Sequence, residues 1–255
     1  MNYWTLNRRA VFSVPLLIAG PLWAQGSPRA VTALVIGGAG RTGQLVVKGL
    51  LARGLTVRGL SRRVDDATAA VPEAAWFAGD VRDPATLATA MAGVTVVVYA
   101  VGGTREHDPG NSAAAIYDVG VATVAAAAKA AGARHFVLLS SAGVTRIGQA
   151  DEDPLREVMT AKRNGEAHVR ASGLGYSIVR THGVWDAAEG KLGILLTQGD
   201  KPSKTRLMTS RRDIARVLAE CAVNPDAAGK SFEIVNVASP DPDTWAQEFS
   251  RLTPD

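Results

Sequence analysis

The chain has 255 residues, of which 47% are hydrophobic and 20% charged, and its formal net charge at pH 7 is +4. These values fit one globular domain, or one domain with a small lobe, and exclude a disordered chain or a low-complexity fibre. One cysteine, Cys221, excludes an internal disulfide and a cysteine-rich zinc module. The small positive charge is not that of a polycation, so we expect no nucleic-acid partner.

The first residues have the pattern of an export signal. A short polar start ends in Arg8-Arg9, and an apolar run from Ala10 to Ala24 follows. At about 15 residues, this run is shorter than the roughly 20 that a membrane-spanning helix needs, so we expect no stable membrane span. The arginine pair resembles the bacterial twin-arginine signal. We predict a signal peptide over residues 1–24 and a periplasmic protein that begins at Gln25, with a cytoplasmic protein as the alternative.

From residue 31 onward, the hydrophobic pattern alternates between the periods of strands and helices. Short apolar runs predict strands at Val31–Ile36, Thr56–Leu60, Ala75–Phe77, Val94–Tyr99, His135–Ser140, Tyr176–Arg180 and Phe232–Val237. Helical spacing predicts helices at Gln44–Arg53, Ala85–Ala92, Asn111–Ala131, Asp153–Ser172 and about Arg212–Ala222. This alternation predicts a Rossmann-like α/β fold, a doubly wound parallel sheet with helices on both faces.

The predicted Rossmann-like domain covers residues 30–240, and no linker or internal repeat divides it. Within it, residues 182–210 have the least regular pattern. We predict that this segment forms a small cap over the carboxyl ends of the strands, where ligands bind in such sheets.

A glycine-rich turn, Gly37-Gly38-Ala39-Gly40-Arg41-Thr42-Gly43, joins the first predicted strand to the first predicted helix. In dinucleotide-binding proteins, glycines at this spacing allow a tight turn and close approach of the backbone to the pyrophosphate. The helix N-terminus then faces the phosphates. We predict that this turn holds a dinucleotide, with a glycine turn that binds nothing as the alternative. The predicted cofactor contacts in the turn are Gly37, Gly38, Gly40, Arg41, Thr42 and Gly43.

The end of the second predicted strand bears on the choice between NAD and NADP. An NAD site usually has an acid about 20 residues after the glycines, whereas this chain has Arg62 and Arg63, and its first acid is Asp65. Because arginine suits a 2′-phosphate, we expect NADP(H) rather than NAD, with Arg41 adding to the same pocket. The alternative is a solvated basic strand end. Asp80, after the third strand, is either a contact at the adenine edge or a turn residue.

Several segments together resemble the atypical short-chain dehydrogenase/reductase superfamily. Besides the glycine turn, they are Ser61–Arg63, Gly79–Asp83, Tyr99–Gly102, Leu138–Val144, Ala161–Glu166, Ser172–Arg180 and Ser210–Ala215. More narrowly, they resemble its NAD(P)H-binding branch, which includes flavin and biliverdin reductase-like proteins. This resemblance covers about residues 31–237 and implies further cofactor contacts at Val81, Ala100, Val101 and Gly102. It leaves the reaction open, because the branch contains reductases, isomerases and non-catalytic nucleotide sensors.

Active members of the superfamily use a serine, a tyrosine and a lysine, with the tyrosine four residues before the lysine. The resemblance assigns Ser141 as the serine, and Lys162 as the lysine, which would also contact the nicotinamide ribose. Val158 stands where the tyrosine is expected. The other tyrosines of the domain lie in different predicted elements: Tyr99, Tyr117 and Tyr176. The alternatives are that Ser141 only ends a strand and that Lys162 is an exposed helix residue.

A histidine is another candidate proton donor. His182 follows the strand at Tyr176–Arg180, where a substrate would bind, and histidine can donate a proton near neutral pH. A polar loop residue is the alternative, and His107 is a weaker candidate. Basic residues in the predicted cap give a faint indication of an anionic substrate: Lys201, Lys204 and Arg206. The spacing of histidine, cysteine and acidic residues predicts no metal site.

Because the tyrosine is absent, we do not expect this protein to interconvert alcohols and ketones as other members of the superfamily do. Hydride transfer remains feasible to a flavin or quinone that takes its proton from water, because the conjugated ring carries the new charge. We therefore predict an NADP(H)-dependent oxidoreductase with a small conjugated acceptor. The alternatives are a non-catalytic NADP(H)-binding sensor or scaffold, and an isomerase that keeps its nucleotide bound.

Overall fold

The computed structural model describes residues 31–102, 111–147, 155–186, 192–202, 207–239, 241 and 243–255. Within these residues, an eight-stranded sheet has the order β3-β2-β1-β4-β5-β6-β10-β8. Its strands are β1 (Thr32–Ile36), β2 (Thr56–Ser61), β3 (Ala75–Ala78), β4 (Val96–Tyr99), β5 (His135–Ser141), β6 (Gly175–Thr181), β8 (Gly193–Thr197) and β10 (Lys230–Val237). Each neighbouring pair is parallel except β10 with β8. The predicted Rossmann-like α/β fold is confirmed.

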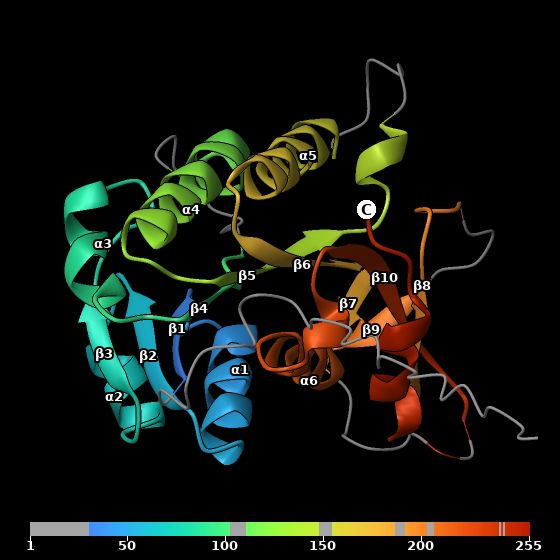
Figure 1. Ribbon diagram of the computed structural model, residues 1–255, viewed down its shortest axis with the longest axis horizontal. Coiled ribbons are helices and arrows are strands. Elements are labelled where there is room, and N and C mark those ends of the chain that lie inside the picture. The colour runs from blue at the N-terminus through green and yellow to red at the C-terminus, as the bar shows by residue number, and fades with distance from the viewer. Residues whose placement is uncertain are drawn as a thin grey trace, which may run out of the picture.

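Helices cover both faces of this sheet (Figure 1). One face carries α3 (Pro84–Met91), α4 (Gly120–Ala130) and α5 (Arg156–Ala171), and the other carries α1 (Arg41–Ala52) and α6 (Arg211–Cys221). The short helices are α2 (Asp65–Ala70), η4 (Val144–Arg146), η5 (Pro225–Ala227) and η6 (Thr244–Arg251). Among the described residues, none of the helices is both long and apolar enough to cross a membrane.

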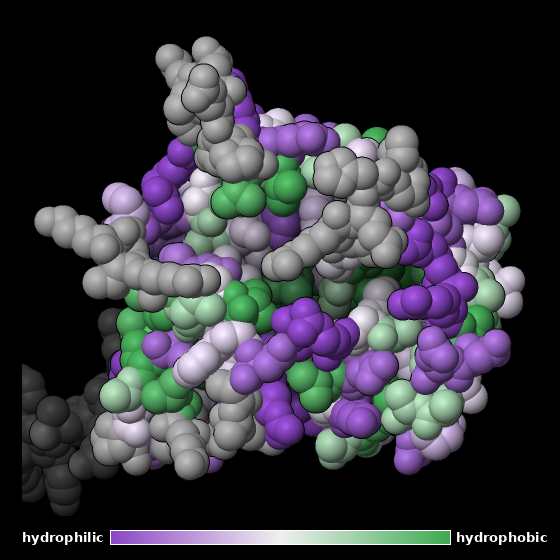
Figure 2. Space-filling view, turned by 180° about the vertical axis from the view of Figure 1, so that it is seen from behind, coloured by the Kyte–Doolittle hydropathy of each residue, from purple (hydrophilic) through white to green (hydrophobic). Residues whose placement is uncertain are grey.

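The apolar core forms two clusters, one on each face of the sheet. Val46 and Leu218 belong to the cluster under α1 and α6, and Leu87 and Val124 belong to the cluster under α3 and α4. The central strands β1 and β4 contribute to both clusters, which explains their continuous apolar sequence. Seen from behind, the surface is hollowed near its centre, with apolar residues at the bottom and hydrophilic residues on the rim (Figure 2).

The helix predicted at Asn111–Ala131 is not one regular α-helix. A π-helical segment, η3 (Ala114–Val119), precedes α4, which ends before Gly132 in the left-handed conformation, as expected for a C-cap. A π turn changes the register by one residue, and the alanine-rich pattern does not distinguish it from an α turn. For the helix predicted from Asp153, the structure describes α5 from Arg156, and its first residues lie outside the described part.

The segment predicted to be an irregular cap, residues 182–210, contains three short strands. β7 (Gly183–Trp185) and β9 (Met208–Ser210) pair with each other in a separate sheet, and β8 joins the main sheet. The sequence analysis did not predict these three strands. The role of the segment as a substrate cap stays a prediction, and Lys204, Arg206 and His107 lie outside the described residues.

A buried charge network ties α5 to the sheet. Arg180 in β6 donates hydrogen bonds to Glu166 in α5, at 2.7 Å, and to Glu233 in β10, at 3.1 Å. Glu166 also accepts a hydrogen bond of 2.7 Å from the hydroxyl of Ser140. All three charged side chains are buried, so each needs its partners.

Arg180→Ala should destabilise the protein by about 3–5 kcal/mol, because it leaves the buried Glu233 carboxylate without its cation and removes one of the two arginines that pair with Glu166. Burial raises the pKa of the Glu233 carboxyl, so the loss should shrink as the pH falls and that carboxyl takes up a proton. Urea unfolding at two pH values measures both effects. Arg53→Ala is the control, since its ion pair with Glu220 is more exposed and should contribute at most about 1 kcal/mol. Equal losses in the two variants would contradict this interpretation.

Candidate functional site

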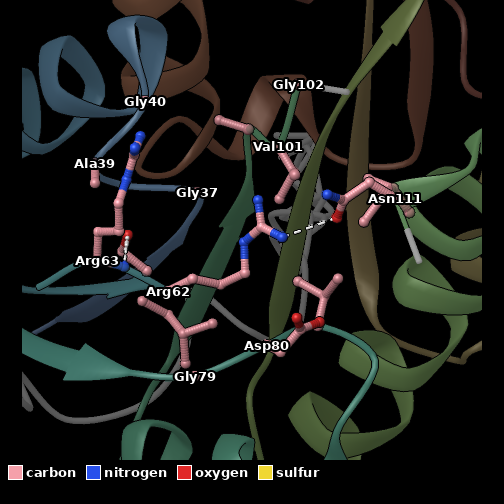
Figure 3. A pocket seen from close by; sticks show the side chains of 15 residues that line it. Gly37, Ala39, Gly40, Arg62, Arg63, Gly79, Asp80, Val101, Gly102 and Asn111 are labelled. Carbon is pink, nitrogen blue, oxygen red and sulfur yellow. Dashed lines mark hydrogen bonds between the residues drawn. The ribbon is translucent and has the colours of Figure 1, made fainter. Parts of the chain in front are cut away.

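A cavity of about 230 Å³ opens where the chain leaves the carboxyl ends of β1, β2, β3 and β4 (Figure 3). Nine of the predicted cofactor residues line it: Gly37, Gly40, Arg62, Arg63, Asp80, Val81, Ala100, Val101 and Gly102. The lining also contains residues that the sequence analysis did not single out as contacts, among them Asn111 and Ile116. The topology thus brings four separate turns of the chain to one cavity.

The glycine turn is packed so tightly that side chains are excluded at two of its positions. Gly37 has a φ of +77°, which glycine adopts without strain. A Cβ at Gly43 would lie 2.1 Å from the carbonyl oxygen of Gly37, so the first turn of α1 rests directly on the glycine turn. Gly40 differs from these two, because its Cβ would meet only the Gly37 oxygen, at 3.2 Å. A side chain at Gly40 would therefore have a single tight contact, with a backbone oxygen of the glycine turn.

The N-terminus of α1 has the features of an anion site. Gly40 is the N-cap, no side chain caps the helix, and its first turn contains no acidic residue. The free N–H groups and the helix dipole at such an end attract a phosphate. Gly38 and Thr42 are buried in the turn instead of lining the cavity, and the Thr42 hydroxyl accepts a 3.0 Å hydrogen bond from Arg211. This geometry fits the pyrophosphate of a dinucleotide.

Two exposed arginines follow β2 at the edge of the cavity. Figure 3 shows Arg62 pointing toward Asn111, whose Oδ1 accepts a 2.9 Å hydrogen bond from its guanidinium. On the next turn, Asp80 is paired with Arg82, and the hydrogen bond from Arg82 lowers the pKa of its carboxyl despite partial burial. The Asp80 charge is therefore compensated by Arg82, while Arg62 and Arg63 present positive charge to the cavity.

Arg41 was expected in the same pocket as Arg62 and Arg63, but its side chain lies outside that cavity. It does not line this cavity, and its guanidinium instead forms a 3.0 Å ion pair with Asp186, just after β7. Asp186 also pairs with Arg211 at 2.8 Å. The contact of Arg41 with a 2′-phosphate stays a prediction, since its ion pair with Asp186 is exposed to solvent. This contact links the glycine turn to the predicted cap.

The predicted serine and lysine both lie near the carboxyl end of β5. Ser141 is the last residue of that strand, and Lys162 is in the second turn of α5. Met159, one turn before Lys162, faces Gly143, since a Cβ there would lie 3.0 Å from its methyl group. Lys162 contacts the aromatic ring of Tyr117, with its Nζ 4.7 Å from the ring centroid. The structure therefore brings a tyrosine to the lysine from η3, although none precedes the lysine in its own helix.

His182 lies between β6 and β7, at the carboxyl edge of the sheet. Its Nδ1 atom is buried and has no hydrogen-bond partner within the described part of the chain. Buried polar atoms are rarely left without a partner, so this nitrogen points to an interaction with a ligand or water. The functional role of His182 stays a prediction, and its unpartnered Nδ1 atom supports it.

Asp200 holds the loop that follows Ser141. It is 1% exposed and accepts hydrogen bonds of 2.9 Å and 2.7 Å from the N–H and hydroxyl of Thr145. This role could not be predicted, because Asp200 lies in the irregular segment, far from Thr145 in the chain. Within the described residues, no group of histidine, cysteine and acidic side chains could hold a metal ion, and Cys221 is buried.

This fold, with a glycine turn at a helix N-terminus and basic residues after β2, defines a dinucleotide-binding protein of the Rossmann type. The family described as NAD(P)H-binding matches residues 37–225, which is most of the chain. The chain belongs to this NAD(P)H-binding family. The predicted resemblance to the NAD(P)H-binding branch of the atypical short-chain dehydrogenases/reductases and the predicted nicotinamide cofactor are therefore confirmed.

The chain is also similar to individual proteins, both in sequence and in structure. An uncharacterized chloroplastic protein of Arabidopsis thaliana is 29% identical over 269 residues, covering 91% of this chain and 82% of the relative. Sanguinarine reductase of Eschscholzia californica is 24% identical and covers 82% of this chain and 90% of that protein. Among solved structures, a putative NAD-dependent epimerase/dehydratase from Bacillus halodurans has a TM-score of 0.76 at 22% identity, covering 87% of this chain and 100% of the other. This structural likeness supports the fold.

Proposed function

We propose that the protein is an NADP(H)-dependent reductase that passes hydride to a small conjugated acceptor, such as a flavin or a quinone. The observation that carries the proposal is the cavity, where an uncapped helix N-terminus and two arginines lie at the ends of neighbouring strands. An uncapped helix end suits the pyrophosphate, and Arg62 and Arg63 suit a 2′-phosphate, which NAD lacks.

The other cofactor residues have proposed roles that follow from their positions. Asp80 and Val81 lie after β3 and would border the adenine, whereas Ala100, Val101 and Gly102 follow β4 and would line the path toward the nicotinamide. Figure 3 shows these turns on opposite sides of the cavity. The bound cofactor supplies the hydride, and the chain supplies position and charge.

The chemistry would take place beside the ends of β5 and β6. Ser141 would hydrogen-bond an acceptor oxygen, and Lys162 would hold the ribose and contribute positive charge near the developing anion. His182 would offer its unpartnered Nδ1 to the acceptor. A conjugated acceptor suits this site because Val158 stands at the usual position of the tyrosine. The name of sanguinarine reductase adds support, since it describes a reduction by a relative.

The proposal is tested by steady-state oxidation of NADPH with matched acceptors: flavins, quinones and saturated aldehydes. We expect turnover with flavins or quinones and little with saturated aldehydes, whose reduction depends on a strong proton donor. NADH should support a lower kcat/KM than NADPH, because it lacks the 2′-phosphate. Turnover of aldehydes alone would contradict the proposed acceptor class.

A non-catalytic NADP(H)-binding sensor or scaffold is the second candidate function. The observation in its favour is Val158, since the superfamily tyrosine is missing from α5. It predicts tight binding of NADPH without turnover of any acceptor. The acceptor panel therefore separates the two functions directly.

Export to the periplasm is a separate proposal that rests on residues 1–24, which lie outside the described part of the chain. The chloroplastic name of a relative supports a removable N-terminal segment, because chloroplast proteins are made with one. N-terminal sequencing of protein from the native cell tests the proposal. A mature start at Gln25 is expected, and a start at Met1 or Asn2 would contradict it.

A further inference from the structure

Ser141, at the end of β5, lies between two anchored residues. On one side, the hydroxyl of Ser140 donates a hydrogen bond to the buried charge network under α5. On the other side, the N–H of Ala142 donates a 2.9 Å hydrogen bond to the Thr181 carbonyl in β6. Gly143 then turns the chain with a φ of +96°, which glycine adopts without strain. From this glycine onward, the loop is held by a segment remote in sequence.

The remote anchor is the carboxylate of Asp200. One of its oxygens accepts a hydrogen bond from the N–H of Gly143, and the other accepts from the N–H and the hydroxyl of Thr145. A further contact comes from Arg146, whose guanidinium donates to the Asp200 backbone carbonyl. Burial acts to raise the pKa of this carboxyl, but the hydrogen bonds from Thr145 and Gly143 outweigh it, so the group is a carboxylate at neutral pH.

The backbone at Asp200 favours glycine, so the backbone does not explain why an aspartate stands there. Among the described residues, Asp200 is the one non-glycine residue with a positive φ, at +47°. Glycine would adopt this conformation without strain and would bury no charge. A buried carboxylate costs desolvation energy unless hydrogen bonds compensate it. The contacts with the loop after Ser141 therefore account for the aspartate.

We propose that Asp200 is a positioning residue of the reductase, which fixes Ser141 through the backbone of Gly143 and Thr145. The inference rests on the proposed function. Asp200 lies in the segment predicted to cap the acceptor, so its carboxylate would hold this segment and Ser141 in one arrangement around the acceptor. Such geometry matters because a displacement of about 1 Å can slow a reaction by about 100-fold. Asp200 would act through Ser141 without touching the acceptor.

Asp200→Asn tests the carboxylate with little change of shape, and asparagine tolerates a positive φ as aspartate does. Its amide turns a donor toward one of the loop N–H groups, so the loop should shift. We expect kcat per bound NADPH to fall by about 10- to 100-fold. The Kd for NADPH should change by less than about twofold, because neither Asp200 nor its loop partners line the cofactor cavity.

A double-mutant cycle with Ser141→Ala shows whether Asp200 acts through Ser141. If it does, Asp200→Asn should lower kcat by less than about threefold once residue 141 is alanine. The same fold loss in both backgrounds is the result of a merely structural role and would overturn the proposal. A wild-type kcat in Asp200→Asn would overturn it too. Binding of NADPH without any turnover by the wild type would overturn the proposed function and, with it, the role of Asp200.

Further variants separate geometry from stability. Lys230→Met removes a buried 2.8 Å hydrogen bond to the Phe249 carbonyl, at the start of β10, so it should lower the melting temperature and leave kcat per bound NADPH unchanged. Thr145→Val removes one hydroxyl from the Asp200 carboxylate and carries the same cycle if Asp200→Asn fails to fold. Its kcat should fall by about 3- to 10-fold, and Thr145→Ser, which keeps the hydroxyl, should recover most of that loss. Equal rates in Thr145→Val and the wild type would contradict the role of the carboxylate.

Discussion

Gly40→Asp is expected to raise the Kd for NADPH by at least about 100-fold while the protein stays folded. Aspartate is a favourable N-cap residue, and its Cβ would have a single tight contact, 3.2 Å from the Gly37 oxygen, so α1 should stay folded. The new carboxylate would stand where the phosphates bind and would repel them. Fluorescence titration with NADPH and thermal unfolding measure the two effects separately.

The control for this variant is Gly40→Asn, which has a similar shape but carries no charge. It should weaken NADPH binding less than Gly40→Asp does, because it adds bulk without like-charge repulsion. An unchanged Kd in Gly40→Asp would contradict the placement of the pyrophosphate at α1. A much lower melting temperature in both variants would contradict the expectation that α1 accepts a side chain at its N-cap, Gly40.

The double variant Arg62→Glu and Arg63→Glu is expected to raise the Kd for NADPH by about 10- to 100-fold. The Kd for NADH should change much less, since NADH lacks the phosphate that these side chains are proposed to bind. The preference for NADPH should therefore be lost or reversed. Titration of each variant with both dinucleotides measures this preference, and low ionic strength should enlarge the effect.

Two further variants serve as controls for the double variant. Arg251→Glu changes a remote exposed charge that pairs with Glu248, so it should leave both affinities unchanged and control for net charge. Arg62→Gln alone should reduce the preference less than the double variant. An equal loss of affinity for NADPH and NADH in the double variant would contradict a 2′-phosphate site at the end of β2.

The fold and the cofactor turn could be predicted because their signals are local. β1 and β4 are continuous apolar runs, and the glycine turn has its spacing within seven consecutive residues, Gly37 to Gly43. In a doubly wound sheet, the position of such a turn fixes where the other strand ends converge. Arg62 and Asp80 could therefore be placed near it from their positions after the second and third predicted strands.

Contacts between remote segments could not be predicted in this way. Asp186 captures Arg41, Asn111 binds Arg62, and Tyr117 meets Lys162, although none of these pairs is close in sequence. The last contact also depends on the π turn of η3, which shifts the register without changing the apolar pattern. A single sequence shows which residue types are present, but tertiary packing decides which of them meet.

We propose, in short, a chain that binds NADPH and uses it to reduce a conjugated acceptor. The most direct test mixes the protein, starting at Gln25 and loaded with one equivalent of NADPH, with a flavin or a quinone and follows NADPH absorbance. We predict rapid loss of that absorbance in the wild type, and no loss above the background reaction in Gly40→Asp. NADPH that stays bound and reduced with every acceptor would contradict the proposed reductase activity and favour a binding protein.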